Sequence, residues 1–89
     1  MNYLITILVA YQLALPAVAY GQSKLLENVK NNPEEAKALC NKFRKNNSMG
    51  ISSRSKQVIE SISQEKNLSF TDAEILSIYV IGMYCPEVK

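Results

Sequence analysis

The sequence predicts an all-α fold: a small bundle of three main helices plus a short N-terminal helix, stapled by one disulfide. Apolar residues recur at three- and four-residue spacing, which places them on one face of a helix. Helix start and stop signals separate these stretches, and no stretch shows the alternation typical of a strand. The two cysteines lie in different helical stretches of a short chain that has the features of an exported protein.

The apolar stretch over residues 70–86 forms the predicted central helix. Thr71 followed by Glu74 fits a capping box at its start, and Phe70 with Ile75 has the spacing of a hydrophobic staple. Nearly every residue after the cap is large and apolar. We therefore expect this helix to be the buried and best protected member of the bundle.

The end of the central helix is marked by Pro86, and Cys85 in its last turn offers a covalent anchor. Cys85 continues the side that carries Ile78 and Gly82, so this side is expected to pack against a neighbour. Gly82 fits two interpretations: it permits close approach of another helix, or it is a tolerated glycine that costs about 1 kcal/mol.

Two further helices are predicted before a loop over residues 46–50. Residues 23–29 form a short helix, and a second helix begins with Asn32 as cap and Pro33 at its first position. The apolar face of the short helix consists of Leu25, Leu26 and Val29. That of the second helix consists of Ala36, Leu39, Cys40 and Phe43.

The third helix follows a loop over residues 46–50, which is rich in residues that tolerate left-handed backbone. Ser52 or Ser53 is the expected cap, and Asn67 is the expected end. The apolar stripe of this helix consists of Val58, Ile59 and Ile62.

Residues 1–19 are predicted to be a signal peptide, with cleavage after Ala19 or after Gly21. The apolar run Tyr3–Leu15 is shorter than the roughly 20 residues of a membrane span. No Lys or Arg precedes this run, so a retained N-terminal anchor is the alternative. Residues 20–89 are predicted to form a single small helical domain.

Cys40 and Cys85 are predicted to form a structural disulfide, as expected for two cysteines in a short exported chain. In the chain-entropy model, the loop that this bond closes would raise the free energy of unfolding by about 4 kcal/mol. A catalytic dithiol and a metal site are the alternatives. The first normally needs closer cysteines or a nearby base, and the second needs more than two soft ligands.

The segment Ala38-Leu39-Cys40, the Ser-containing third helix and the ending Tyr84-Cys85-Pro86 resemble a family of small secreted helical domains. That family is known chiefly from actinobacteria and is catalogued as a domain of unknown function. The resemblance covers residues 23–87. It implies a secreted all-α domain whose two cysteines pair, and it implies no catalytic or binding residues.

No catalytic residue, metal site or cofactor is predicted. The chain has no His, which removes the commonest general base and metal ligand. The adjacent acids Glu34 and Glu35 are best explained by helix capping, since they lie in a first turn. Asn46 and Asn67 each begin an N-glycosylation sequon, which matters only in a eukaryotic secretory pathway.

Charge is distributed unevenly, although the net formal charge is only +2. Six cations and no acid lie between Glu35 and Glu60, whereas acids predominate from Glu60 onward. The six cations are candidate contacts for an anionic envelope component, and they are Lys37, Lys42, Arg44, Lys45, Arg54 and Lys56. The alternative is the solvated side of two helices. Nucleic acid is not an expected partner, and no small-molecule substrate is identified.

The sequence thus predicts a secreted or envelope-located, non-enzymatic helical protein that serves as a binding or structural module. One alternative is a membrane-tethered peptide with a retained anchor and its basic segment at the lipid surface. A weaker alternative is an exported thiol-dependent enzyme.

Overall fold

The computed structural model describes residues 24–89, and the predicted signal peptide and its cleavage sites lie outside this range. Residues 24–31 are helical and are followed by three longer helices. These are α2 (Pro33–Ser48), α3 (Lys56–Lys66) and α4 (Phe70–Tyr84). The described part contains no strand, so the predicted all-α bundle with a short first helix is confirmed. None of the described helices is long and apolar enough to cross a membrane.

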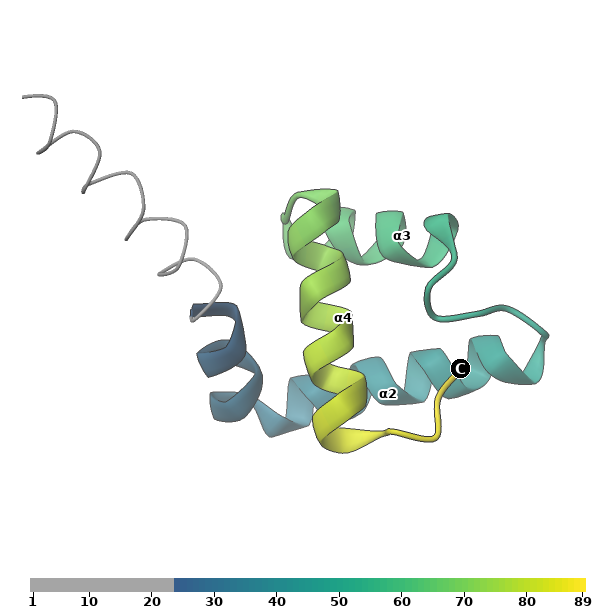
Figure 1. The fold of residues 1–89 in the computed structure, drawn as a ribbon, viewed down its shortest axis with the longest axis horizontal. Helices are drawn as coiled ribbons and strands as arrows, with labels where there is room; N and C mark the ends of the chain where they lie inside the picture. The colour runs from purple at the N-terminus through teal and green to yellow at the C-terminus, as the bar shows by residue number, and fades with distance from the viewer. Residues whose placement is uncertain (1–23) are drawn as a thin grey trace, which may run out of the picture.

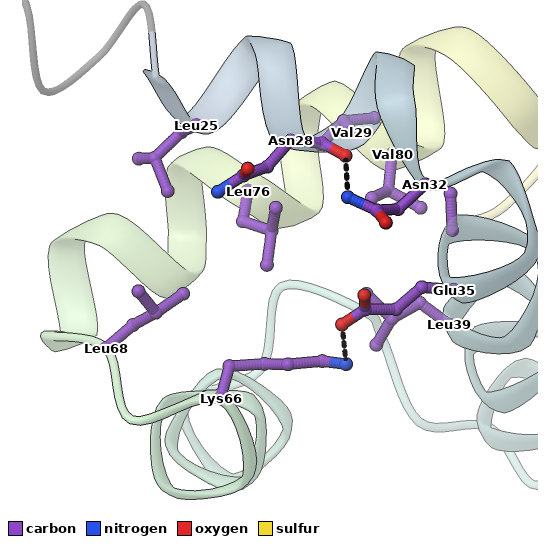
Figure 2. Close-up of a pocket in the computed structure, with 11 residues that line it drawn as sticks. Leu25, Asn28, Val29, Asn32, Glu35, Leu39, Lys66, Leu68, Leu76 and Val80 are labelled. Carbon is purple, nitrogen blue, oxygen red and sulfur yellow. Dashed lines mark hydrogen bonds and ion pairs between the residues drawn. The ribbon is translucent and has the colours of Figure 1, made fainter.

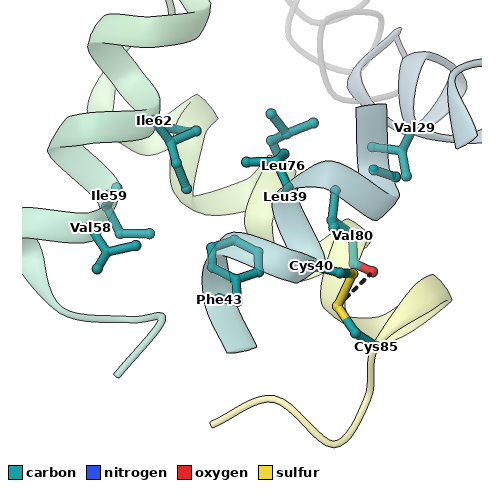
Figure 3. Close-up of a cluster of buried hydrophobic side chains, with 12 residues drawn as sticks. Val29, Leu39, Cys40, Phe43, Val58, Ile59, Ile62, Leu76, Val80 and Cys85 are labelled. Carbon is teal, nitrogen blue, oxygen red and sulfur yellow. Dashed lines mark hydrogen bonds between the residues drawn. A yellow bond between two sulfur atoms is a disulfide. The ribbon is translucent and has the colours of Figure 1, made fainter. Parts of the chain in front are cut away.

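Helix α4 bridges the other two long helices in space. Figure 1 shows it starting beside α3 and ending beside α2, and it packs against both. The core lies where the three helices meet (Figure 3). Its largest fully buried side chains are Phe43, Ile59 and Val80, one from each long helix. The predicted apolar faces of α2 and α3 are confirmed, because every residue assigned to them is buried.

Helix α2 begins as the sequence predicts, with Asn32 at the cap position and Pro33 as its first residue. The side chain of Asn32 does not cap the helix; it donates instead to the carbonyl of Asn28, at 2.8 Å. This bond ties the end of the 24–31 helix to the start of α2. Tyr84 adds a second tie, since its hydroxyl donates to the Val29 carbonyl at 3.4 Å.

The start of α3 differs from the prediction. The cap position is Ser55, not Ser52 or Ser53. Ser53 is buried instead, and its backbone N–H donates to the Lys89 carbonyl at 2.8 Å. Ser52 and Ser53 thus lie in the connection between α2 and α3, which is bonded to the C-terminal residue Lys89. The predicted end is confirmed: Asn67 adopts the left-handed backbone (φ 55°) that Asn tolerates better than most residues.

The cap of α4 also differs from the prediction. Ser69 is the cap, and its hydroxyl accepts from the backbone N–H of Asp72 at 3.1 Å. Thr71 lies inside the first turn, so the predicted Thr71–Glu74 capping box is wrong. The predicted staple of Phe70 with Ile75 is wrong too, because Phe70 is itself the first helical residue and is exposed.

Replacing Ser69 by Ala is expected to lower the free energy of unfolding by about 1 kcal/mol, because the Asp72 N–H loses its acceptor. Thr71→Ala is the matched control and is expected to change stability by less than about 0.5 kcal/mol. Urea titration followed by circular dichroism measures both. A larger loss for Thr71→Ala than for Ser69→Ala would contradict the observed cap.

Helix α4 is apolar on two sides, and only one of them is buried. Ala73, Leu76, Ser77 and Val80 face the core, whereas Ile78 is 46% exposed. The expectation that the whole helix is buried is therefore wrong, because two partner helices cover only one side of it. Gly82 lies on the exposed side, and a Cβ there would meet nothing within 4 Å. It is a tolerated glycine, with no close helix approach.

The predicted disulfide is confirmed: Cys40 of α2 is bonded to Cys85, the residue that follows α4. Both cysteines are almost fully buried, and they are the only ones in the chain. Because the bond lies at the edge of the core (Figure 3), it fixes the end of α4 against the middle of α2.

Candidate ligand-binding pocket

A pocket of about 300 Å³ lies between the 24–31 helix, α2, α4 and the connection from α3 to α4. Figure 2 shows the side chains that surround it. Its lining has two parts, an apolar floor with walls and a polar rim. The apolar lining consists of Leu25, Val29, Ala36, Leu39, Leu68, Leu76 and Val80. The polar lining consists of Asn28, Asn32, Glu35 and Lys66.

The floor follows from helical spacing. Leu76 and Val80 are four residues apart on α4, so they lie one above the other on the same side of the helix. Leu25 and Val29 have the same spacing on the 24–31 helix and form the facing wall. These four side chains are buried within the chain, yet they leave space between them. The space is in the lower part of the range seen for small-molecule sites.

The rim is built around an ion pair between Lys66 Nζ and Glu35 Oε1. Glu35 comes from the first turn of α2 and Lys66 is the last residue of α3, so each charge is favourable at its helix end. Figure 2 shows the Lys66 side chain reaching across the opening to Glu35. Only 22% of that side chain is exposed, so its methylene stem also covers apolar surface.

The two asparagines complete the rim. The side chain of Asn32 is used in its bond to the Asn28 carbonyl. The side-chain amide of Asn28 makes no hydrogen bond within residues 24–89, and it lies on the pocket. The rim thus offers an ammonium, a carboxylate and the side-chain amide of Asn28, with no net charge.

A second, smaller hollow of about 220 Å³ lies between α2 and α3. Lys42 and Glu65 stand on its edge and are joined by a hydrogen bond of 2.6 Å. Buried Leu39, Phe43 and Ile62 lie below them. Because the ion pair spans the two helices, this hollow is best described as the seam between α2 and α3.

The predicted basic segment lies outside the first pocket, and acids accompany most of its cations. Lys42 pairs with Glu65, and Arg44 pairs with Glu87 at 2.7 Å. Lys37 and Lys56 lie 3.9 and 3.8 Å from acids of their own helices. Lys45 and Arg54 form no ion pair within the described residues. Contact of this segment with an anionic partner stays a prediction.

Two of these ion pairs perturb a carboxyl group. The hydrogen bond from Lys42 lowers the pKa of Glu65 below its ordinary value of 4.5. The hydrogen bond from Arg44 does the same to the pKa of Glu87. Each carboxyl group therefore releases its proton more readily in the folded chain than in the unfolded chain.

We expect stability to fall as the pH drops from 5 to 3. A carboxyl group whose pKa is lower in the folded state stabilises the fold at pH values above its unfolded-state pKa, near 4.5. This stabilisation is lost as the pH falls through the folded-state pKa. The double variant Lys42→Met/Arg44→Met should lose less stability over the same range. Urea titrations at the two pH values measure the difference, and an unchanged pH dependence in the variant would contradict the assignment.

Sequence reasoning did not find the pocket. Glu35 was explained by its first-turn position, and Lys66 lies outside the predicted basic segment. The two residues are 31 positions apart, and no motif connects them. The described residues contain no cluster of His, Cys, Asp and Glu that could hold a metal ion. What the pocket offers is apolar space with hydrogen-bonding groups at its opening.

Comparison with known proteins places the chain in a family without an assigned role. No curated protein matches the chain. No solved structure matches it either. A protein-family model described as "Domain of unknown function (DUF8664)" matches residues 26–85, which include all three long helices and both cysteines. The chain therefore belongs to the DUF8664 family of domains of unknown function.

Proposed function

We propose that this protein is an exported, non-enzymatic binding module that acts at the cell envelope or outside the cell and holds a small ligand in the pocket beside Glu35 and Lys66. The pocket is the observation that carries the proposal. Its apolar floor and hydrogen-bonding rim are the two parts from which small-molecule sites are usually built.

Export is supported by two independent features. Residues 1–19 have the apolar run and small-residue cleavage site of a signal peptide. The disulfide between Cys40 and Cys85 is of a kind that persists mainly in oxidising compartments. A binding role, in place of catalysis, is supported by the chemistry of the rim: the one carboxylate at the opening is already engaged by an ammonium group.

The test uses the protein recovered after export from expressing cells, labelled with ¹⁵N. Small molecules extracted from the envelope of cells that carry the protein naturally are added, and amide chemical shifts are recorded. We expect the shifts to change around residues 25–29, 35–39 and 76–80, because each of these ranges contains residues that line the pocket. Amides at the start of α3 serve as the internal reference. Changes confined to the basic residues of α2, or no changes at all, would overturn the proposal.

A second candidate is the membrane-tethered form with a retained N-terminal segment. Phe70 and Ile78 favour it, because both are exposed on the same side of α4 and would meet a lipid interface. N-terminal sequencing of envelope material separates the two forms. Secretion predicts a first residue of Tyr20 or Gln22, whereas tethering predicts Met1.

A further inference from the structure

We infer that the ligand of this pocket is an uncharged single-chain amphiphile, with its alkyl chain among the leucines and its polar head between Glu35 and Lys66. This inference rests on the proposed function and adds the ligand class to it. Three properties of the pocket lead to this class: its size, its apolar depth and the charge balance of its rim.

The size of the pocket limits the length of the ligand. Liquid water occupies about 30 Å³ per molecule, so a space of about 300 Å³ holds about ten heavy atoms. The apolar lining comes from three helical segments, with Leu39 on α2, and from Leu68 in the connection between α3 and α4 (Figure 2). A single alkyl chain of about eight carbons with a small head group fits such a space, and a second chain would exceed it.

The rim selects against a charged head group. A carboxylate or phosphate on the ligand would compete with Glu35 for the ammonium group of Lys66. A ligand ammonium would compete with Lys66 for Glu35 in the same way. An uncharged head that both donates and accepts hydrogen bonds can use both side chains without separating them from their counter-charge. The side-chain amide of Asn28, which lines the pocket, offers a third partner of the same kind.

The experiment titrates the exported protein with primary alkyl amides of increasing length and follows amide chemical shifts. From butanamide to octanamide, which has ten heavy atoms, affinity is expected to rise about fourfold per methylene group. It should then level off, because the pocket is full. A continued rise with longer chains would overturn the inference, since it would indicate adsorption to the exposed apolar side of α4.

Head groups are compared at constant chain length. Octanamide is expected to bind more tightly than octanoate or octylammonium at pH 7. Tighter binding of octanoate would overturn the uncharged assignment. If no member of the series binds while the envelope extract still shifts the pocket residues, the ligand class is wrong and the proposed function stands.

Variants at the rim test the head-group contact. Glu35→Gln should weaken octanamide binding about three- to tenfold and should reverse the preference, so that octanoate binds better than octanamide. Lys66→Gln should shift the preference toward octylammonium. Glu34→Gln and Lys56→Gln are matched controls, because both side chains are exposed and lie outside the pocket. Equal preferences in the wild type and both rim variants would overturn the inference.

Discussion

Replacing Cys40 and Cys85 together by Ser is expected to lower the free energy of unfolding by about 2–5 kcal/mol. The bond joins residues 45 positions apart, so its loss restores much conformational freedom to the unfolded chain. The core of so small a domain seldom supplies more than about 3–5 kcal/mol. The double variant should therefore be partly unfolded at 37 °C.

Urea titration of the variant and of the wild type measures this effect. Wild-type protein treated with a reductant is the matched control, because it loses the bond while keeping every side chain in place. Both samples should lose stability to a similar extent. A loss below about 1 kcal/mol in both would mean that the noncovalent core holds α4 against α2 without the bond.

The second large effect is expected in the core. Ile59→Ala should destabilise the protein by about 2–5 kcal/mol, because this side chain is only 1% exposed and packs among the buried side chains of the core. Ile78→Ala removes the same atoms from a residue that is 46% exposed on α4. Its cost should stay below about 1 kcal/mol, since little apolar surface is returned to water.

Denaturant titration of the two variants gives a direct comparison, because the chemical change is identical. A cost for Ile78→Ala close to that of Ile59→Ala would show that the outer side of α4 is covered in solution. Sedimentation of the same samples would then reveal self-association. The isolated chain, as the structure describes it, predicts a clear difference between the two.

Helical spacing predicted the fold because the buried sides of α2 and α3 are surrounded by polar residues. Phe43 is buried between Lys42 and Arg44 in the sequence, and Ile62 is buried between Ser61 and Ser63. The disulfide followed from cysteine number and placement. Helix α4 gave no such contrast, because apolar residues occupy both its sides. Which side faces the core is decided by the positions of α2 and α3, and these do not follow from the sequence of α4.

The cap of α4 and the pocket could not be predicted from the sequence, for two different reasons. Ser69 and Thr71 are both good caps, and only the backbone geometry shows that the helix starts at Phe70. The pocket depends on distances between helices. Glu35 and Lys66 meet because α3 ends opposite the start of α2. Local spacing carries no information about such an encounter, whereas it fixes each apolar face well.

The disulfide closes a covalent ring of residues 40–85, which contains α3 and all of α4. The 24–31 helix is not part of this ring. A protease that cuts the exposed turn at Met49 therefore leaves two fragments that stay linked until a reductant is added. A cut between residues 29 and 33 leaves an N-terminal fragment with no covalent link to the ring. That fragment carries Leu25 and Val29, so trimming there opens one wall of the pocket and leaves the ring intact.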